Sequence, residues 1–383
     1  AIVELCVHSL RIGAQDALLD CPTREKGAYL GDATISGHAH MLVSADLAYA
    51  RKSLDDYAQT AFICPGLMSV APCSFMQEIA DYSLQSPAQL LRFFMHSGDM
   101  ECLSAHVTTL ENLMRYFQRF ARADGLLADV TEKWNLVDWP ANLRDGYDFP
   151  LTDPPQKGIH AVLNAFWLAA IRDTNAILAL LGKPPFADEA SCREAFQRTF
   201  YSPELRLFVD APGSQHASLH SNALALYADA APAEALPRII DLIREKRFAC
   251  GVYMAYFVLK GLARGGAHDL VYDLILDDGE HSWRNMLREG ATTLFEAWGK
   301  DQKWNTSLCH PWASAPIPVL IEDILGVTPA EPGWRAIRFA PRIPQRLKEV
   351  SLKFTTVCGE ILVTHDSRGT NIRAPGGVRV LRE

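Results

Sequence analysis

The spacing of apolar residues predicts that most of the chain is helical. Apolar positions recur every three or four residues, which is the period of a helix buried along one side. The segments with this period are 33–60, 84–97, 102–123, 157–181, 188–200, 215–229, 234–247, 252–264, 267–277 and 313–325. Turn-forming residues separate them, such as the Gly-Lys-Pro-Pro sequence at 182–185. With one more helix at the start, we expect about eleven helices before residue 326.

The helices are of two kinds, which predicts two layers. Residues 160–170 (HAVLNAFWLAA) and 252–259 (VYMAYFVL) are apolar on nearly every side, so other elements must enclose them. Residues 236–247 keep one polar side and are expected at the surface. Such a mixture favours a helical toroid of two concentric layers. A helical solenoid is the alternative, although we find no repeat of fixed period.

The pattern changes after Pro329. Residues 334–339, 350–354 and 359–365 alternate between apolar and polar, which is the period of a half-buried strand. We therefore predict a small antiparallel sheet over residues 329–383. Because about 55 residues rarely support a core of their own, we expect the sheet to pack on a helical body formed by residues 1–328.

Composition narrows the class of function. The 383 residues include 37 Lys and Arg against 45 Asp and Glu, a net charge of −8. The basic residues are scattered and no apolar run reaches the length of a membrane span, so we expect neither a nucleic-acid partner nor a membrane. The nine cysteines are an odd number, widely spread and mostly in apolar surroundings, which favours reduced, buried thiols and a cytoplasmic setting. No Cys-x-x-Cys pair is present, so we expect no structural zinc site. The chain begins with Ala1 rather than Met, as a fragment or a processed form would. Nothing in the sequence indicates an oligomeric state.

Three carboxylates gather in residues 20–32 (DCPTREKGAYLGD). Asp20, Glu25 and Asp32 lie in a segment that one proline and two glycines keep out of a regular helix. Loops held on a rigid scaffold often carry function, and the charges of Arg24 and Lys26 would alter the pKa values of these carboxylates. A solvated, charged turn is the alternative interpretation.

A further carboxylate lies in an aromatic setting. Glu296 stands between Phe295 and Trp298 in a mostly apolar run, where a carboxylate is either paired or has a raised pKa. Six of the eight tryptophans fall in residues 134–139 and 283–312, and the first stretch also contains Asp138. Tryptophan faces suit the C–H groups of sugars, and opposed carboxylates cleave glycosidic bonds. A helical Glu with an ordinary ion pair, and tryptophans packed in the core, are the alternatives.

Other signals are weaker. His38 and His40 resemble a metal-binding pair, but no third ligand accompanies them in the sequence, so we expect no metal. Cys309 and His310 are adjacent along the chain, which does not by itself make a catalytic pair. Phosphate-binding, dinucleotide-binding and Gly-x-Ser-x-Gly motifs are absent from the sequence, and we expect no cofactor.

Four motifs resemble those of glycoside hydrolase family 78, the bacterial α-L-rhamnosidases, and they occur in the same order along the chain as in that family. Residues 20–32 are similar to the acidic motif of the family, and Val-Asp-Trp at 137–139 to its Gly-Asp-Trp segment. GATTLFEAW at 290–298 is similar to its Gly-Ala-Thr-Thr-x-Trp-Glu stretch, and Ser-Leu-Cys-His at 307–310 to its Ser-x-x-His segment. Val137 and Phe295 stand where the family usually has Gly and Trp, and the acidic motif is one residue shorter than the commonest form.

The resemblance implies an (α/α)6 barrel of six helical hairpins over residues 1–328, followed by a β-domain over residues 329–383. It also implies an inverting glycosidase that releases terminal α-L-rhamnose from glycosides or polysaccharides. Glu25 would be the general acid and Glu296 the general base. The remaining positions would bind the sugar, its hydroxyls at Asp20, Asp32, Asp138 and His310 and its apolar faces at Trp139 and Trp298.

Two other functions stay open at this point. One is a six-hairpin glycosidase for a different sugar, including a uronic acid if Arg144 and Arg284 reach the site. The other is a catalytically silent toroid that binds carbohydrate. The presence of both candidate carboxylates argues against the silent protein.

Overall fold

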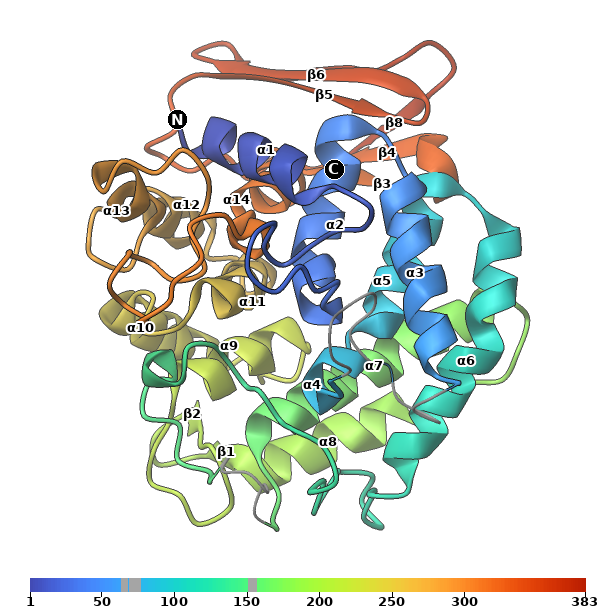
Figure 1. Ribbon diagram of the computed structural model, residues 1–383, viewed down its shortest axis with the longest axis vertical. Helices are drawn as coiled ribbons and strands as arrows, with labels where there is room; N and C mark the ends of the chain where they lie inside the picture. Colours follow the sequence, from blue (N-terminus) through green and yellow to red (C-terminus); the bar gives the residue numbers. More distant parts are fainter. Residues whose placement is uncertain (63–67, 69–76, 151–156) are drawn as a thin grey trace.

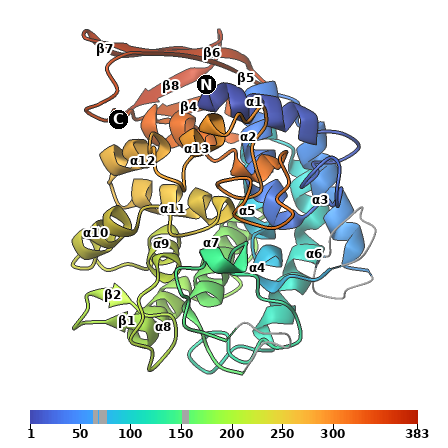
Figure 2. The same cartoon turned by 60° about the vertical axis from the view of Figure 1, so that its left-hand side comes forward.

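Two concentric layers of helices form the body of the molecule in the computed structural model, which describes residues 1–62, 68, 77–150 and 157–383 (Figures 1 and 2). Each inner helix packs on the next, and the last returns to the first, so the inner layer is a closed ring. Its members are α2 (Leu30–Ser44), α5 (Ser86–Ser97), α7 (Ala161–Leu180), α9 (Leu219–Tyr227), α11 (Val252–Arg264) and the short α14 (Pro316–Pro318), continued by the π-helix η3 (Val319–Ile324).

The outer layer alternates with the inner one along the chain. Each outer helix precedes an inner helix, so that the pairs make six hairpins. The outer helices are α1 (Ile2–Gly13), α3 (Ala48–Thr60), α6 (Met100–Gln118), α8 (Glu189–Phe200), α10 (Leu236–Lys246) and α12 (His268–Ile275). The connections contain α4 (Ala80–Ser83), η1 (Ala141–Leu143), β1 (Tyr201–Ser202), β2 (Leu207–Phe208), α13 (Trp283–Arg288) and η2 (Pro311–Ala313). The predicted toroid is confirmed.

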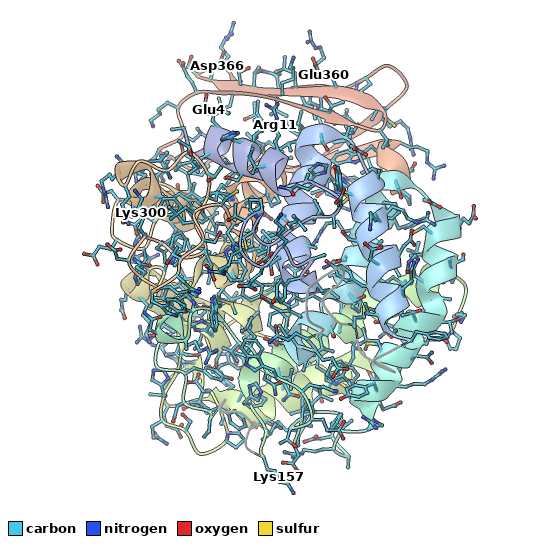
Figure 3. All side chains as sticks on the ribbon, in the orientation of Figure 1. Glu4, Arg11, Lys157, Lys300, Glu360 and Asp366 are labelled. Carbon is cyan, nitrogen blue, oxygen red and sulfur yellow. The ribbon has the colours of Figure 1, made fainter. Side chains whose placement is uncertain are left out.

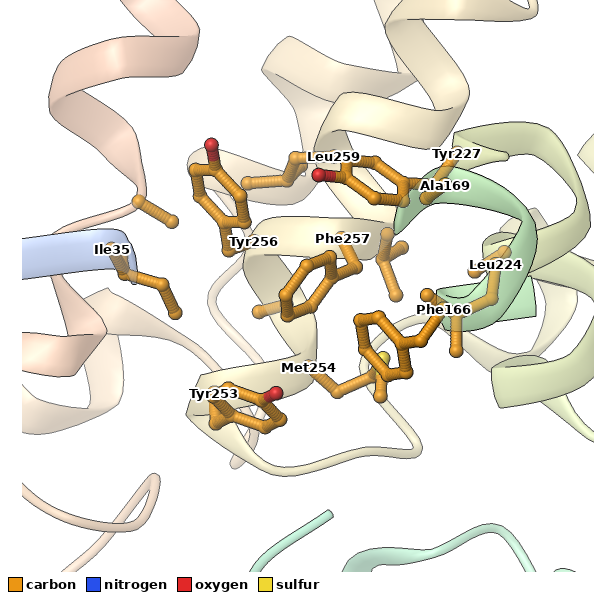
Figure 4. Packing of buried hydrophobic residues seen from close by; sticks show 14 of the residues in the cluster. Ile35, Phe166, Ala169, Leu224, Tyr227, Tyr253, Met254, Tyr256, Phe257 and Leu259 are labelled. Carbon is orange, nitrogen blue, oxygen red and sulfur yellow. The ribbon is translucent and has the colours of Figure 1, made fainter. Parts of the chain in front are cut away.

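Burial follows the patterns read from the sequence. All of α9 is buried, whereas α10 buries only Ile239, Leu242 and Ile243. At the centre, Phe257 of α11 lies edge-on to Phe166 of α7 and to Tyr227 of α9, each at a ring-centroid distance of 5.1 Å (Figure 4). An inner helix thus contacts neighbours on all sides, which is why its sequence lacks a polar face.

Two predicted segments are broken where the sequence pattern is continuous. Segment 33–60 is two helices, because Ala45 adopts a left-handed conformation (φ 55°) that ends α2. Segment 313–325 is a one-turn helix followed by the wider π-helix. Apolar spacing alone does not mark either change.

The C-terminal strands form two three-stranded sheets that lie over α1 and α2 (Figure 1). The first joins β3 (Val327–Pro329), β4 (Ala336–Phe339) and β8 (Arg379–Arg382), and η4 (Pro332–Trp334) connects β3 to β4. The second is an antiparallel meander of β5 (Val350–Thr356), β6 (Gly359–Asp366) and β7 (Gly369–Arg373).

The predicted antiparallel pairing is confirmed for β3 with β4 and for β5, β6 and β7, and one pairing differs. Strands β4 and β8 are parallel, with Ala336 opposite Arg379, because the chain makes the meander between them and then returns in the same direction. The division at residue 328 stays a prediction. Among the described residues, no helix is both long enough and apolar enough to cross a membrane.

His160 is a buried histidine at the start of α7. Its Nδ1 atom lies 3.0 Å from the hydroxyl of Tyr147, and its ring stacks on Phe149 at 4.5 Å. Burial lowers its pKa from 6.5 to about 3, so the folded protein holds the ring neutral. The unfolded chain takes up a proton near pH 6.5. The neutral His160 ring therefore makes its full contribution to the free energy of unfolding above pH 6.5. This contribution is lost as the pH falls toward 3.

We expect His160→Asn to make the fold less sensitive to acid. The amide keeps a hydrogen-bonding group near Tyr147 but does not titrate. Between pH 7 and 4.5 the free energy of unfolding should fall by about 2 kcal/mol less in the variant than in the unsubstituted protein, as measured by urea unfolding. His8→Asn is the control, at an exposed histidine whose Nδ1 atom lies 2.8 Å from the carbonyl of Thr292, and its loss of stability between pH 7 and 4.5 should match that of the unsubstituted protein. Equal losses in His160→Asn and the unsubstituted protein would contradict this role.

Candidate active site

A cavity of about 400 Å3 opens at the end of the barrel where the chain enters the inner helices. Its described lining comes from the connections before α2, α5, α7 and α14, or from the first turn of the helix that follows. Successive hairpins place all such connections at one end of a toroid, which is how motifs far apart in sequence meet. The described lining residues are Asp20, Glu25, Tyr29, Asp32, Gln77, Ile79, Tyr82, Trp134, Leu136, Trp139, Glu296, His310 and Trp312.

Glu296 is the most heavily hydrogen-bonded carboxylate of the cavity. Its Oε1 atom accepts the indole N–H of Trp139 at 3.0 Å and lies 3.1 Å from Nζ of Lys303. Its Oε2 atom accepts from Nη1 of Arg24 at 3.0 Å and from the backbone N–H of Ser307 at 2.8 Å. The residue lies in a loop, so the alternative of a helical Glu with a partner one turn away is wrong.

These partners hold Glu296 in its charged form. Burial alone would raise its pKa, but the charge of His310 and the hydrogen bonds from Arg24 and Ser307 lower it to about 2. A carboxylate with this pKa is ionised at neutral pH. It therefore suits the role of a proton acceptor and not that of a proton donor.

Glu25 is the more open of the two candidate carboxylates. One third of its side chain (33%) is exposed, against 3% for Glu296. The hydroxyl of Tyr29 donates to its Oε2 atom at 2.9 Å, and Nη2 of Arg24 donates to its Oε1 atom at 2.7 Å. A single guanidinium thus stands between Glu25 and Glu296. The loop before α2 and the orange loop after α13 lie side by side as a result (Figure 1).

Asp20, Asp32 and His310 form a buried polar wall. Nε2 of His310 lies 2.9 Å from Oδ1 of Asp32, and Oδ1 of Asp20 accepts the backbone N–H of Gly27 at 2.7 Å. Burial raises the pKa of both aspartates, to about 6 for Asp32. Burial would lower the pKa of His310, but its hydrogen bond to Asp32 and the nearby carboxylates raise it. Proton donors and acceptors at this wall suit a hydroxylated ligand.

Two of the predicted sugar-binding residues lie behind the cavity and not in its lining. Asp138 is fully buried, and its Oδ2 atom lies 2.7 Å from both Nε2 of His220 and the backbone nitrogen of Gly251. Trp298 donates to the carbonyl of Cys250 at 2.7 Å and packs between two other aromatic rings. Their contact with sugar stays a prediction that this placement does not favour. Trp139, in contrast, lines the cavity.

The segment that carries Trp139 is held tightly against α11. A Cβ atom at Gly251 would overlap the carbonyl oxygen of Trp139 and lie 2.6 Å from Oδ1 of Asp138, so this position requires glycine. Val137, where the family pattern has glycine, adopts a left-handed φ of 61°. The backbone therefore keeps the conformation that a glycine would favour, although the residue is branched.

Two groups of side chains have the composition of a metal site. In the first, on inner helices, His38 and His96 lie near Glu322. Both nitrogens of His38 already have partners, at 3.0 Å from Tyr256 and 2.7 Å from Glu322, and Nζ of Lys260 lies 2.8 Å from the same carboxylate. A metal ion at this place would have to displace these hydrogen bonds and the ammonium group of Lys260. His40, the other histidine singled out in the sequence, lies 3.2 Å from the hydroxyl of Ser44 instead.

The second group lies in the candidate site and consists of Asp20, Cys21 and His310. The thiol of Cys21 donates to Oδ2 of Asp20 at 3.1 Å. Burial raises the pKa of this thiol to about 11, so without a metal ion the thiol is a neutral hydrogen-bond donor to Asp20.

Sequence reasoning found six of the described lining residues and missed seven. Trp134 and Trp312 belong to the two tryptophan-rich stretches, so the clustering signal was present. Lys303, which contacts Glu296 from outside the lining, lies in the second of these stretches. Tyr29 lies within the acidic motif at 20–32 and Leu136 within the first tryptophan-rich stretch. Gln77, Ile79 and Tyr82 carry no local signal.

Comparison with known proteins identifies the architecture. The family model of the bacterial alpha-L-rhamnosidase 6 hairpin glycosidase domain matches residues 1–324, and that of the bacterial alpha-L-rhamnosidase C-terminal domain matches residues 326–375. The chain belongs to this family. The family assignment and the (α/α)6 fold predicted from the four motifs are confirmed.

Solved rhamnosidase structures share the fold of this six-hairpin glycosidase domain at low sequence identity. A GH78 family rhamnosidase of Bacillus sp. GL1 superposes with a TM-score of 0.86 over 100% of this chain and 41% of its own, at 22% identity. The Streptomyces avermitilis alpha-L-rhamnosidase complexed with L-rhamnose gives a TM-score of 0.80 over 100% of this chain and 37% of its own, at 18% identity.

A curated rhamnosidase is also similar to this chain in sequence. The Alpha-L-rhamnosidase of Alteromonas sp. (strain LOR) is 22% identical over 377 residues, which are 91% of this chain and 39% of that protein. The six-hairpin chain thus spans about two fifths of the length of the curated relatives that it matches.

Proposed function

We propose that this chain hydrolyses terminal α-L-rhamnosides with inversion at the anomeric carbon. The observation that carries the proposal is the pair of carboxylates on either side of one guanidinium, in a cavity lined by tryptophans. Family membership supports the sugar, since the Alteromonas and Formosa agariphila relatives are named Alpha-L-rhamnosidase. The Streptomyces relative was solved with L-rhamnose bound.

The two carboxylates differ in the way that an inverting reaction needs. Glu296, ionised and buried, is the base that takes a proton from water as the water attacks the anomeric carbon. Glu25, nearer the mouth, is the acid that protonates the glycosidic oxygen as its bond to that carbon breaks. The products are rhamnose of opposite anomeric configuration and a free alcohol.

The polar wall would bind the sugar hydroxyls. Asp32 and His310 form a pair that both donates and accepts, and Asp20 lies beside them in the lining. Trp139 would cover an apolar side of the ring while its N–H fixes the base. Orientation of the sugar by this wall would place its anomeric carbon between Glu25 and Glu296.

A substrate panel with stereochemical readout tests this function. The chain is incubated with aryl α-L-rhamnoside and, in parallel, with other aryl glycosides, and the first anomer released is followed by NMR. Preferential turnover of the rhamnoside with β-L-rhamnose as the first product is the expected result. Release of the α anomer first would overturn inversion, and preference for another sugar would overturn the rhamnoside assignment.

The uronic-acid alternative gains no support from the two arginines on which it was based. Arg144 donates to the carbonyl of Asp138 and Arg284 to that of Leu276, and neither lines the cavity, so no basic group for a uronate comes from them. Sugar binding without turnover of any glycoside in the same panel would favour the silent binding protein.

We expect Arg24→Gln to change the acidic side of the pH–rate profile. The guanidinium donates to Glu296 and helps to hold its pKa near 2, so its loss should raise that pKa toward the usual range of a carboxyl group. Glu296 then becomes protonated at a higher pH. Values of kcat/KM for an aryl rhamnoside should begin to fall below about pH 5 in the variant, which gives its pH–rate profile an acidic limb. In the unsubstituted enzyme, protonation of Glu296 should cause no such fall at about pH 5.

Arg24→Lys provides the matched control because it keeps the positive charge. Its acidic limb should lie between those of the unsubstituted enzyme and Arg24→Gln. An acidic limb that is identical in all three proteins would mean that Arg24 does not set the protonation of the base.

A further inference from the structure

Trp304 differs from the other seven tryptophans of the chain in its exposure. Its side chain is 93% exposed, whereas the others are buried or half-buried. It lies in the loop between α13 and η2, and Lys300 of the same loop lies at the outer surface of the molecule (Figure 3). An indole in water is a large apolar surface without a partner.

The residues on either side of Trp304 are anchored to the candidate active site. Nζ of Lys303 lies 3.1 Å from Glu296, and the carbonyl of Asn305 accepts from Arg24, which also holds Glu25. Because consecutive Cα atoms are about 3.8 Å apart, the backbone of Trp304 lies at the rim of the cavity. The amide and hydroxyl of Thr306 both donate to the carbonyl of Lys303, which closes a turn with Trp304 near its tip.

The different exposure of the two carboxylates indicates how a substrate is oriented between the interior and the mouth of the cavity. Glu296 is almost completely covered and Glu25 is one-third exposed, so the sugar is inside and the mouth is on the side of the acid. The leaving group is attached to the oxygen that the acid protonates. It therefore extends past Glu25 toward the rim, where Arg24 connects Glu25 to the turn of Trp304.

We propose that Trp304 is a platform for the leaving group and that the preferred substrates are rhamnosides of planar, aromatic aglycones. This inference rests on the proposed function. A second sugar in this place would need hydrogen-bonding side chains beside the indole. The flanking ones are already engaged, since Lys303 binds Glu296 and also donates to the side chain of Asn305. Among the described residues, the exposed indole is the largest apolar surface of this turn, and its face suits ring stacking.

The test compares Trp304→Ala and Trp304→Phe with the unsubstituted enzyme on three substrates. These are 2-naphthyl α-L-rhamnoside, a rhamnosyl-glucose disaccharide and methyl α-L-rhamnoside. Because each variant is compared on the same substrate, differences in leaving-group reactivity cancel. Leu381→Ala, at an exposed apolar residue of β8, is the control, and thermal unfolding checks that all proteins fold.

For Trp304→Ala we expect kcat/KM on the naphthyl rhamnoside to fall about 2- to 12-fold, mainly through KM, with little change on the other two substrates. Trp304→Phe should retain most of the activity. Equal losses on all three substrates, no loss on any, or a loss confined to the disaccharide would overturn the aromatic platform while leaving rhamnoside hydrolysis intact. Failure of the unsubstituted enzyme to hydrolyse any of the rhamnosides would instead overturn the proposed function, and the platform with it.

Discussion

Glu296→Gln is expected to reduce kcat for every rhamnoside about 10^2- to 10^4-fold, because an amide cannot take the proton of the attacking water. The loss should not depend on the leaving group, since activation of water is needed whatever departs. KM should change less than kcat, because the side chain keeps its size and its one amide oxygen can still accept a hydrogen bond from either Trp139 or Ser307. Initial rates on aryl and methyl rhamnosides measure both parameters.

Glu280→Gln is the matched control for this substitution. Glu280 is exposed on the same long connection and lies outside the described lining of the cavity, so its substitution should leave kcat unchanged. Thermal unfolding of both variants separates loss of chemistry from loss of fold. A Glu296→Gln protein with more than about one tenth of the original kcat would remove Glu296 from the role of base.

Glu25→Gln should show the second-largest effect, and its size should depend on the leaving group. Methyl α-L-rhamnoside releases a poor leaving group that needs a proton, so kcat should fall about 10^2- to 10^4-fold. 4-Nitrophenyl α-L-rhamnoside releases a stable phenolate, so the loss should be much smaller. The ratio of the two losses is the measurement that identifies an acid.

Tyr29→Phe serves as the companion variant. It removes the hydroxyl that donates to Glu25 and leaves the carboxyl group in place, so both substrates should be affected alike and modestly. If Glu25→Gln slowed both substrates by the same factor, Glu25 would have a role in binding or in structure and a different residue would be the acid.

Prediction from sequence is strongest where local pattern determines structure. The apolar faces of residues 160–170 and 252–259 predict enclosed helices, and both are in the inner ring. It is weaker where a residue's role depends on which way its side chain points. Asp138 and Trp139 are neighbours in one motif, yet Trp139 lines the cavity and Asp138 is fixed behind it by His220 and Gly251.

The meeting of the two carboxylates is not visible in the sequence without the family resemblance. Arg24 and Glu296 are 272 positions apart, and no spacing rule connects residues at such a separation. The parallel pairing of β4 with β8 is hidden for the same reason, because it depends on the path taken by an intervening meander. The break of helix at Ala45 depends on one backbone conformation that alanine does not usually favour.

Closure of the inner ring has a consequence for synthesis on the ribosome. Helix α1 packs on α14, and Asp32 in the first hairpin bonds to His310 just before the last inner helix, 278 positions later. At about 5 to 20 residues per second, translation separates these two residues by roughly 15 to 55 s. During that time the apolar inner sides of the first five hairpins have no complete ring around them. The helices of these hairpins therefore expose apolar surface until the last inner helix has been made, and the candidate active-site cavity forms only after Glu296 and His310 have joined the chain.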